Sequence, residues 1–369
     1  MANYNLEHEL KVDTTLSSYP VLIGQSLLKN ESLLQKQVVS KQVMVVTDKI
    51  VAPLYLEMVR RAFADRQCDV VILPEGEVSK TYTSVKQVYD ALVEKNHHRD
   101  TTLIALGGCV IGDMTGFVAA TYQRGVAFVQ IPTTLLAQVD ASIGGKTAIN
   151  HEKAKNSIGT FYQPSAVIMD LTTLNTLPLR EFRAGLGEVI KYAILEGGEF
   201  VGLLEKALLH GLADKNQAYL SDMVNHCCQI KMSYIDHDER DEHDKRALLN
   251  LGHTFAHALE TYTHYQRWLH GEAVAIGLCC AALLSFEMQA CDEKTLKHIQ
   301  QLVRLAQLPT QIPHEVDLIS LSRLMMKDKK VKNNQLRLIL LKGLGQCYIE
   351  EQVNKDKLIK VLQQACEGE

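Results

Sequence analysis

The hydrophobic residues in the first half of the chain fall into short runs rich in Val and Ile, separated by stretches with helical spacing. Such runs are typical of the buried strands of a parallel sheet whose connections are crossover helices. The pattern therefore predicts an α/β domain built on a parallel sheet. The five runs are QVMVVTDKI (42–50), DVVILPEG (69–76), TTLIALGG (101–108), VAFVQIPTT (126–134) and AVIMDL (166–171).

The second half has longer segments in which apolar positions recur with helical spacing, so we expect it to be mostly helical. One exception is 336–353, where two apolar runs around two glycines predict a hairpin. We place the domain boundary near Pro178, which gives an α/β domain at 1–178 and a helical domain at 179–369. The clearest helical segments are 180–197, 247–262 and 271–290.

The composition is that of a folded, soluble enzyme: 46% of the 369 residues are hydrophobic and 22% are charged. A formal net charge of -4 without a Lys/Arg-rich run argues against nucleic acid as a partner. The nine cysteines lack CxxC spacing, which fits a reducing compartment. The N-terminus carries no signal or transit pattern, and the longest uncharged apolar stretch, 273–286, is too short to span a bilayer. We expect a cytoplasmic protein with no membrane attachment.

A glycine-rich turn, GGCVIGDMTG, follows the third predicted strand and leads into a helix expected to begin at about Asp113. Backbone N–H groups at the N-terminus of a helix bind anions, so a pyrophosphate would suit this turn. Its spacing differs from the GxGxxG of the standard dinucleotide fingerprint, and glycine turns are also common as structural punctuation. These residues alone leave cofactor binding and a purely structural turn both open.

Charged residues follow the neighbouring predicted strands. Asp48 ends the first strand, where a carboxylate can accept hydrogen bonds from a ribose diol or can cap the helix that begins near Val51. Glu77 and Lys80 follow the next strand at the same edge of the sheet. Their position favours a nucleotide site at this edge.

The helical half carries three fragments that together suit a metal ion. His253 and His257 stand four residues apart, so both rings lie on one helix face, and the Thr after His253 rules out the H-E-x-x-H protease motif. His270 precedes another helix, and Glu188 and Lys191 share one face of a third. One carboxylate and two imidazoles would hold zinc and leave positions for substrate oxygens. For any single histidine, an ordinary surface or core position remains the alternative.

Seven motifs, in order over nearly the whole chain, closely resemble those of the 3-dehydroquinate synthases. The resemblance implies a dehydroquinate synthase-like fold of the sugar phosphate cyclase superfamily, with a Rossmann-type N-terminal domain and a helical C-terminal domain that holds the metal. It implies NAD and Zn2+ as cofactors, with Co2+ possible in place of zinc. The motifs are GGCVIGDMTGFVAATYQRGV, QIPTTLLAQVDASIGGKTAIN, KNSIGTFYQP, AGLGEVIKYAI, RALLNLGHTFAHALE, HGEAVAIG and MKDKK.

The resemblance also implies roles for individual residues. It gives the metal to Glu188, His253 and His270. It implies a homodimer in which Arg124 reaches the neighbouring subunit's site. NAD contacts are implied for Asp48, Glu75, Gly76, Glu77, Lys80, Gly108, Cys109, Val110, Ile111, Gly112, Asp113, Thr133, Thr134, Asp140, Lys146, Lys155, Thr173, Leu174, Asn175 and Thr176. Substrate contacts or catalytic roles are implied for Asp140, Lys146, Asn156, Lys191, Lys231, Arg246, Asn250, His257 and one lysine of MKDKK, Lys329 or Lys330.

The reaction implied is that of a lyase in the shikimate pathway, which leads to chorismate and the aromatic amino acids. The substrate would be a sugar acid phosphate, 3-deoxy-D-arabino-heptulosonate 7-phosphate, and the products 3-dehydroquinate and phosphate. NAD oxidises a hydroxyl transiently, phosphate leaves by β-elimination, the hydride returns and an intramolecular aldol addition closes the ring. Negative groups at both ends of this substrate explain the lysines and arginines among the implied residues.

Other activities would use the same features. A metal-dependent polyol dehydrogenase of this architecture would release NADH, and another sugar phosphate cyclase would act on a sedoheptulose or glucose phosphate. The set of Lys146, Asn156, Lys231 and Arg246 favours a substrate that bears a carboxylate. An inert binding protein on the same fold would have lost part of the site, whereas every expected polar residue is present.

Some implied roles have alternatives, and two stretches depart from the family's motifs. His257 is the candidate for proton handling, with a hydrogen bond that merely supports a metal ligand as the alternative. Lys191 either contacts the substrate or neutralises Glu188.

Cys109 stands where the family usually has a third glycine, so the backbone must approach a pyrophosphate beside a side chain. The stretch DERDEHDKR is one residue longer than usual, which weakens the carry-over at 238–245.

Overall fold

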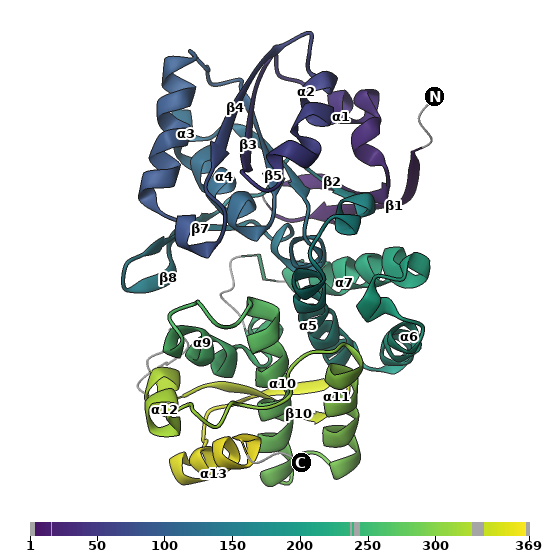
Figure 1. Ribbon diagram of the computed structural model, residues 1–369, viewed down its shortest axis with the longest axis vertical. Coiled ribbons are helices and arrows are strands. Elements are labelled where there is room, and N and C mark those ends of the chain that lie inside the picture. Colours follow the sequence, from purple (N-terminus) through teal and green to yellow (C-terminus); the bar gives the residue numbers. More distant parts are fainter. Residues whose placement is uncertain (1–3, 16, 237, 240–243, 327–335, 367–369) are drawn as a thin grey trace. The chain divides into compact units, whose positions relative to one another are not determined.

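The computed structural model of the protein describes residues 4–15, 17–236, 238–239, 244–326 and 336–366 (Figure 1). The chain divides into two compact units, Met1–Leu177 and Pro178–Glu369. The first is an α/β unit and the second is mostly helical, as the sequence pattern predicts.

A seven-stranded sheet in the order β1-β2-β9-β6-β5-β3-β4 forms the first unit. All neighbours pair in parallel except β1, which is antiparallel to β2. The five apolar runs of the sequence form β3, β4, β5, β6 and β9. The strands are β1 (Asn5–Asp13), β2 (Ser18–Gln25), β3 (Gln42–Asp48), β4 (Gln67–Leu73), β5 (Thr102–Gly107), β6 (Ala127–Pro132) and β9 (Ala166–Asp170), and β7 (Lys146–His151) and β8 (Ala154–Phe161) form a separate hairpin.

Helices cover both faces of this sheet, which is why its strands are apolar throughout. Alternate residues of β3 show the division: Val43 and Val45 belong to one apolar core, and Met44 and Val46 to the other. The first core includes α1 and α2, and the second includes α3 and α4. The helices are α1 (Glu31–Gln37), α2 (Glu57–Ala62), α3 (Tyr82–Glu94) and α4 (Cys109–Thr121).

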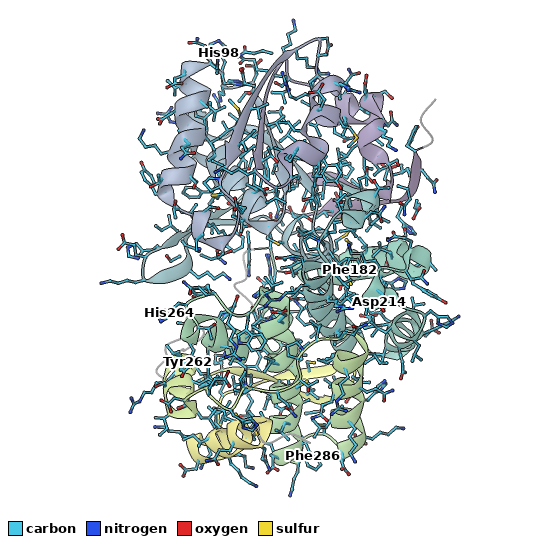
Figure 2. All side chains as sticks on the ribbon, viewed as in Figure 1. His98, Phe182, Asp214, Tyr262, His264 and Phe286 are labelled. Atoms are coloured by element: carbon cyan, nitrogen blue, oxygen red, sulfur yellow. The ribbon has the colours of Figure 1, made fainter. Side chains whose placement is uncertain are left out.

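The second unit is built around α10, a helix that is apolar on all sides and therefore buried. Phe182, on α5, is also fully buried (Figure 2). The elements are α5 (Leu179–Glu196), α6 (Gly198–Leu209), α7 (Leu220–Ile235), α8 (Asp244–Ala247), α9 (His253–Tyr262), α10 (His270–Glu287), α11 (Glu293–Leu305), α12 (Leu318–Met326), β10 (Leu338–Gly343), β11 (Gln346–Glu350) and α13 (Lys355–Cys366).

Length and composition alone would allow α10 to cross a membrane, but 78% of it is buried inside the protein, as expected of a core helix. The hairpin predicted in the last part of the chain is confirmed by β10 and β11, which pair antiparallel from Leu338 opposite Glu350. One predicted boundary is wrong: α4 begins at Cys109, because Gly108 already serves as its N-cap, and Asp113 lies in its second turn.

Candidate functional site

Most residues expected to contact a nucleotide lie at one edge of the first unit's sheet. Parallel strands end at the same edge, so the segments after β3, β4, β5, β6 and β9 come together there. The chain goes outward from β3 to β4 and then returns to β5 on the other side of β3. Crevices at such reversals of strand order are where open α/β sheets bind ligands. Here the reversal brings Asp48 and Gly108 to neighbouring strand ends.

The glycine turn is packed closely against the strand beside it. A Cβ at Gly108 would lie 3.1 Å from Thr134 Cγ2, and one at Gly112 would lie 2.8 Å from Gln130 Oε1. The two glycines therefore let the first turn of α4 approach the segment after β6, which carries Thr133 and Thr134. The N-terminal N–H groups of the 13-residue α4 lie at this turn, where the sequence predicts an anion site.

Cys109, Val110 and Ile111 belong to the first turn of α4. Cys109 has no left-handed backbone conformation, so its position does not require glycine. Burial raises the pKa of the Cys109 thiol, and the Asp113 and Asp140 carboxylates add to the effect. The thiol is therefore neutral near pH 7 and adds no negative charge where a pyrophosphate would lie.

Ion pairs and a hydrogen bond involve five of the expected residues. Lys80 is 3% exposed, and its ammonium contacts the Asp113 carboxylate and lies 2.6 Å from Asn156 Oδ1. Lys155 Nζ lies 4.0 Å from Glu77 Oε1. The turn after β4, the helix α4 and the hairpin strand β8 are thereby held together within the first unit.

The remaining expected nucleotide contacts lie on nearby turns. Asp48 Oδ1 accepts hydrogen bonds from the N–H groups of Ile50 and Val51 at 2.9 Å and so stabilises the turn that follows β3. Tyr55 Oη lies 3.2 Å from the Thr173 carbonyl and 2.5 Å from Thr176 Oγ1. Leu174 and Asn175 share that turn, Glu75 and Gly76 precede Glu77, Asp140 lies in a single helical turn at 137–141, and Lys146 begins β7.

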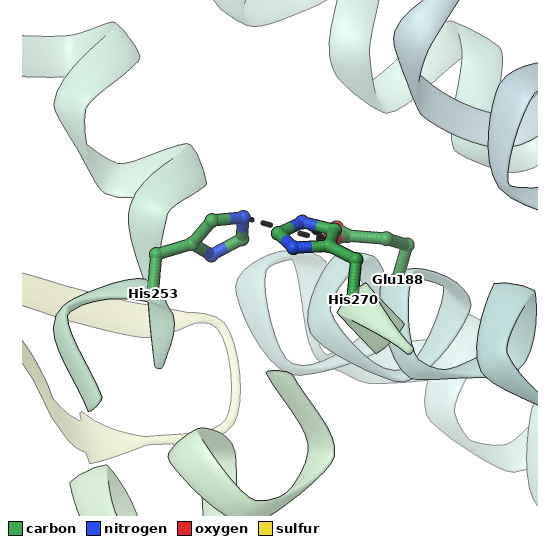
Figure 3. A group of neighbouring side chains, drawn as sticks. All are labelled: Glu188, His253 and His270. Carbon is green, nitrogen blue, oxygen red and sulfur yellow. Dashed lines mark ion pairs between the residues drawn. The ribbon is translucent and has the colours of Figure 1, made fainter. Parts of the chain in front are cut away.

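Three side chains from separate helices of the second unit converge on one point. Glu188 (α5), His253 (α9) and His270 (α10) each offer one ligand atom, and these atoms lie within 4.8 Å of one another (Figure 3). His253 Nε2 and His270 Nε2 lie 3.4 Å and 3.6 Å from Glu188 Oε1. Among the described residues, no other group of His, Cys, Asp and Glu has this arrangement. The convergence expected from the sequence is therefore present.

The second nitrogen of each imidazole is engaged on the side away from Glu188. His253 Nδ1 lies 3.1 Å from the Leu251 carbonyl, and His270 Nδ1 lies 3.2 Å from Glu260 Oε1. Both acceptors favour a proton on Nδ1, which leaves the lone pair of each Nε2 directed at the point of convergence. The residues thus fit a divalent cation such as zinc by ligand type and by orientation.

Sequence reasoning did not identify Glu260, which is 3% exposed and faces His270 from α9. A signal was present, because Glu260 stands three residues after His257 and seven after His253, on the same helix face. That spacing alone could not show that the acceptor is needed by a histidine from another helix.

Close helix crossings at glycines fix the positions of the ligands. A Cβ at Gly271 would lie 1.7 Å from the Ala184 carbonyl oxygen, so α10 and α5 touch backbone to backbone beside His270 and Glu188. A Cβ at Gly277 would lie 2.1 Å from the carbonyl oxygen of Gly252, the residue before His253. Each metal-site residue thus lies next to or near a contact that tolerates no side chain.

Two further expected residues adjoin the three ligands. Lys191 Nζ lies 2.5 Å from Glu188 Oε2 and 4.5 Å from the Tyr192 ring, and the lysine is 1% exposed. The His257 ring centre lies 5.6 Å from that of His253. Lys191 therefore neutralises Glu188 in this structure, which was the structural alternative, and His257 stands beside the imidazole ligands.

Three other expected substrate residues of the second unit lie on α7, on α8 and in the turn 248–250. Lys231 is buried on α7, and the guanidinium of the buried Arg246 donates to the carbonyls of Asp238 and Glu239. Asn250 Nδ2 donates to the Ala247 carbonyl at 3.0 Å. Lys329 and Lys330 lie outside the described residues.

Arg124 is exposed on the first unit in a turn of unusual conformation. Gln123 and Arg124 have φ angles of 50° and 64°, and Gly125 follows with 122°. Two successive residues with side chains in the left-handed region carry a conformational cost, and such strain is concentrated at functional positions.

Comparisons with known proteins cover most of the chain. Residues 70–184 match the family described as 3-dehydroquinate synthase N-terminal, and residues 185–331 match 3-dehydroquinate synthase C-terminal. The 3-dehydroquinate synthase of Legionella pneumophila subsp. pneumophila (strain Philadelphia 1) is 53% identical over 369 residues, the full length of both chains. That of Coxiella burnetii (strain CbuK_Q154) is 47% identical over 354 residues, which are 96% of this chain and 98% of the relative.

A solved structure shows the same fold. ValA, the 2-epi-5-epi-valiolone synthase from Streptomyces hygroscopicus subsp. jinggangensis 5008 with NAD+ and Zn2+ bound, superposes with a TM-score of 0.86 at 26% identity. The match covers 95% of this chain and 97% of that one.

Proposed function

The chain belongs to the 3-dehydroquinate synthase family, and we propose that it converts 3-deoxy-D-arabino-heptulosonate 7-phosphate to 3-dehydroquinate and inorganic phosphate. This is a lyase reaction of the shikimate pathway, which supplies the aromatic amino acids. The observation that carries the proposal is the convergence of Glu188, His253 and His270, with both Nε2 atoms directed at the carboxylate.

The second unit would hold the metal through these three side chains. Zn2+ accepts one carboxylate and two imidazoles and keeps positions open for substrate oxygens, and Co2+ accepts the same donors. ValA, whose structure contains Zn2+ and NAD+, supports the choice of metal. When bound, zinc supplies Lewis acidity toward a substrate hydroxyl and NAD supplies reversible hydride acceptance. The protein's own contribution is to fix the ligands, which Glu260 and the Leu251 carbonyl do by holding Nδ1 of each imidazole.

The buried cations would bind the anionic groups of the substrate. Lys191, Lys231 and Arg246 are each less than a tenth exposed. Charges attract more strongly in a buried site than in water, because the protein interior screens them less, so a phosphate or carboxylate within reach of these side chains gains more than it would on the surface. Lys191 would then divide its charge between Glu188 and the substrate, and Asn250 would add an amide donor. His257 would accept or return a proton beside the reacting hydroxyl.

The first unit would hold NAD at the carboxyl edge of its sheet. The N–H groups of the α4 N-terminus would bind the pyrophosphate, and Asp48 Oδ2 would accept from a ribose hydroxyl. Glu75 to Lys80, Thr133, Thr134, Asp140, Lys146, Lys155 and the turn Thr173–Thr176 would complete the contacts. The neutral Cys109 thiol is compatible with this arrangement.

Two further parts of the proposal concern the assembly and the compartment. A homodimer would place the exposed Arg124 of one protomer in the site of its partner, and the strained backbone at this position supports a role beyond folding. Nine free cysteines agree with a cytoplasmic setting.

Phosphate release tests the proposal directly. Purified protein loaded with zinc and NAD should release one inorganic phosphate per 3-deoxy-D-arabino-heptulosonate 7-phosphate, without accumulation of NADH absorbance. A chelator should abolish the release, and added Zn2+ or Co2+ should restore it. If a polyol yields NADH while the heptulosonate phosphate yields no phosphate, the protein is a dehydrogenase and the proposal is wrong. Release from sedoheptulose 7-phosphate alone would instead indicate another cyclase.

A further inference from the structure

Asn150 connects two segments of the first unit through three hydrogen bonds. It lies in β7, and its backbone N–H donates to the Lys80 carbonyl at 2.8 Å. Its Nδ2 donates to Glu77 Oε1 at 2.8 Å, and its Oδ1 accepts from the Asn156 N–H at 2.8 Å. One amide side chain is thus bound to the turn after β4 and to the hairpin strand β8.

Lys80 closes these contacts into a ring. Its ammonium donates to Asn156 Oδ1 at 2.6 Å, so the path from Glu77 through Asn150 and Asn156 returns to the same turn. The ammonium also contacts Asp113 on α4. The ring therefore joins residues expected to contact NAD, namely Glu77, Lys80 and Asp113, to a residue expected to contact the substrate, Asn156.

The local backbone shows that the hairpin needs this support. The register of β7 and β8 shifts between Ile149 and His151, so Asn150 lies at an irregularity in the ladder. Asn156 has a φ of 50°, in the left-handed region. Such a conformation persists when surrounding contacts determine it, and here the Asn150 and Lys80 bonds do so.

The chemistry of the ring requires an amide at position 150. The side chain must donate to the Glu77 carboxylate and accept from a backbone N–H at the same time, and a carboxamide does both. An aspartate has the same shape and can accept, but it cannot donate and would set a second negative charge against Glu77.

We propose that Asn150 is a positioning residue that couples the turn after β4, where Glu77 and Lys80 would contact NAD, to the β7–β8 hairpin, where Asn156 would contact the substrate. Each ligand would then strengthen the binding of the other. The proposal rests on the function proposed above. NAD bound at Glu77 and Lys80 holds the ring and with it the conformation of Asn156, which removes part of the ordering cost of substrate binding. By linkage the substrate strengthens NAD binding by the same factor.

The test is Asn150→Asp, with Asn30→Asp as the matched control. Asn30 caps α1 through Oδ1, a role that aspartate fills equally, so the control adds the same charge to the same unit. In Asn150→Asp we expect the NAD Kd, measured by calorimetry, and the KM for the heptulosonate phosphate each to rise about tenfold, with a smaller change in kcat. The thermal midpoint should stay close to that of the control.

A second variant separates positioning from folding. In Asn150→Asp combined with Glu77→Gln, the glutamine amide can donate to the new carboxylate, so NAD affinity and the effect of NAD on KM should recover toward the level of Glu77→Gln alone. The proposal is overturned if Asn150→Asp keeps the wild-type Kd and KM, if only its thermal midpoint falls, or if the double variant shows no recovery. Absence of phosphate release by the unaltered enzyme would reject the proposed function. An NAD Kd that Asn150→Asp leaves unchanged would reject this inference alone.

Discussion

The ligand atoms at the metal centre are held in place by groups that never touch the metal. Glu260 is nearly fully buried and faces His270 Nδ1 at 3.2 Å, so its carboxylate determines which nitrogen of the ring carries the proton. Burial of a carboxylate costs free energy, and a metal-bound imidazole opposite it strengthens the hydrogen bond that offsets this cost. We therefore assign the carboxylate to metal affinity rather than to fold stability.

Glu260→Gln tests this assignment with little change in shape. The amide oxygen can still accept from Nδ1, but the loss of charge should lower zinc affinity about 10- to 100-fold. Competition with a chromogenic chelator measures the affinity without need of turnover. Glu205→Gln is the control, because Glu205 faces His298, 3.5 Å away and outside the ligand set, and should leave zinc affinity unchanged. Equal losses in both variants would show that Glu260 has no specific role.

Cys109→Gly tests whether the Cys109 side chain in the glycine-rich turn hinders binding of the NAD pyrophosphate. Because Cys109 already has an ordinary helical position, glycine relieves no strain and should cost about 0.5–1 kcal/mol of stability. We expect the NAD Kd to change by less than about threefold, since the thiol is neutral and the N–H groups are unaltered. Calorimetry and thermal unfolding measure the two effects. A tenfold tighter Kd in the variant would instead mean that the Cys109 side chain obstructs the cofactor.

At the scale of elements, close contacts between helices at glycines position the metal ligands. α5 and α10 meet at Gly187 and Gly271, and Arg180 on the first turn of α5 binds both Glu272 oxygens at 2.7 Å and 2.8 Å. Glu272 also accepts from the Leu269 N–H at the start of α10. Backbone contact and ion pair together fix the first turn of α10, which carries His270.

Gly271→Ala should separate α5 from α10 and lose the metal. Its Cβ would overlap the Ala184 carbonyl, and we expect a loss of about 1–3 kcal/mol or more of stability together with reduced zinc content. Gly202→Ala on α6 is the control: nothing lies within 4 Å of its Cβ, so alanine should be neutral or stabilising by up to about 1 kcal/mol. Thermal unfolding measures the stability of both variants, and metal analysis measures their zinc content. A Gly271→Ala protein with full zinc and unchanged stability would contradict the structure.

The sequence predicted those strands that are marked by a pattern within their own segment. β3, β5 and β6 are buried on both faces and appear as continuous apolar runs, and the hairpin β10–β11 is marked by its turn glycines. β1 was missed because only Leu6, Leu10 and Val12 of its nine residues are apolar, and β7 and β8 because they contain few apolar residues. β1 pairs with the neighbouring β2 and β7 with the neighbouring β8, but the side-chain bond from Asn150 to Glu77 joins residues 73 positions apart, which no window of sequence contains.

At the scale of the whole molecule, the order of the motifs along the chain predicted more of the metal site than hydrophobic pattern and residue spacing did. Spacing alone placed His253 and His257 on one face but could not bring Glu188, some 65 positions earlier, to the same point. The resemblance supplied that grouping, and the glycine crossings explain it. Arg124, which we propose to act in the site of a second copy of the chain, has no local signal beyond the strained turn.

A mixture of two inactive variants tests the shared site. In a homodimer with Arg124 acting in its partner's site, Arg124→Ala protomers keep a complete metal centre, and His253→Ala protomers keep the arginine. Each variant alone should release phosphate at less than about a hundredth of the wild-type rate. Random re-pairing gives half mixed dimers, each with one complete site in two, so about a quarter of wild-type activity should return. If Arg124 acted within its own protomer, no mixed dimer would contain a complete site and the mixture would stay inactive, which phosphate release before and after subunit exchange would reveal.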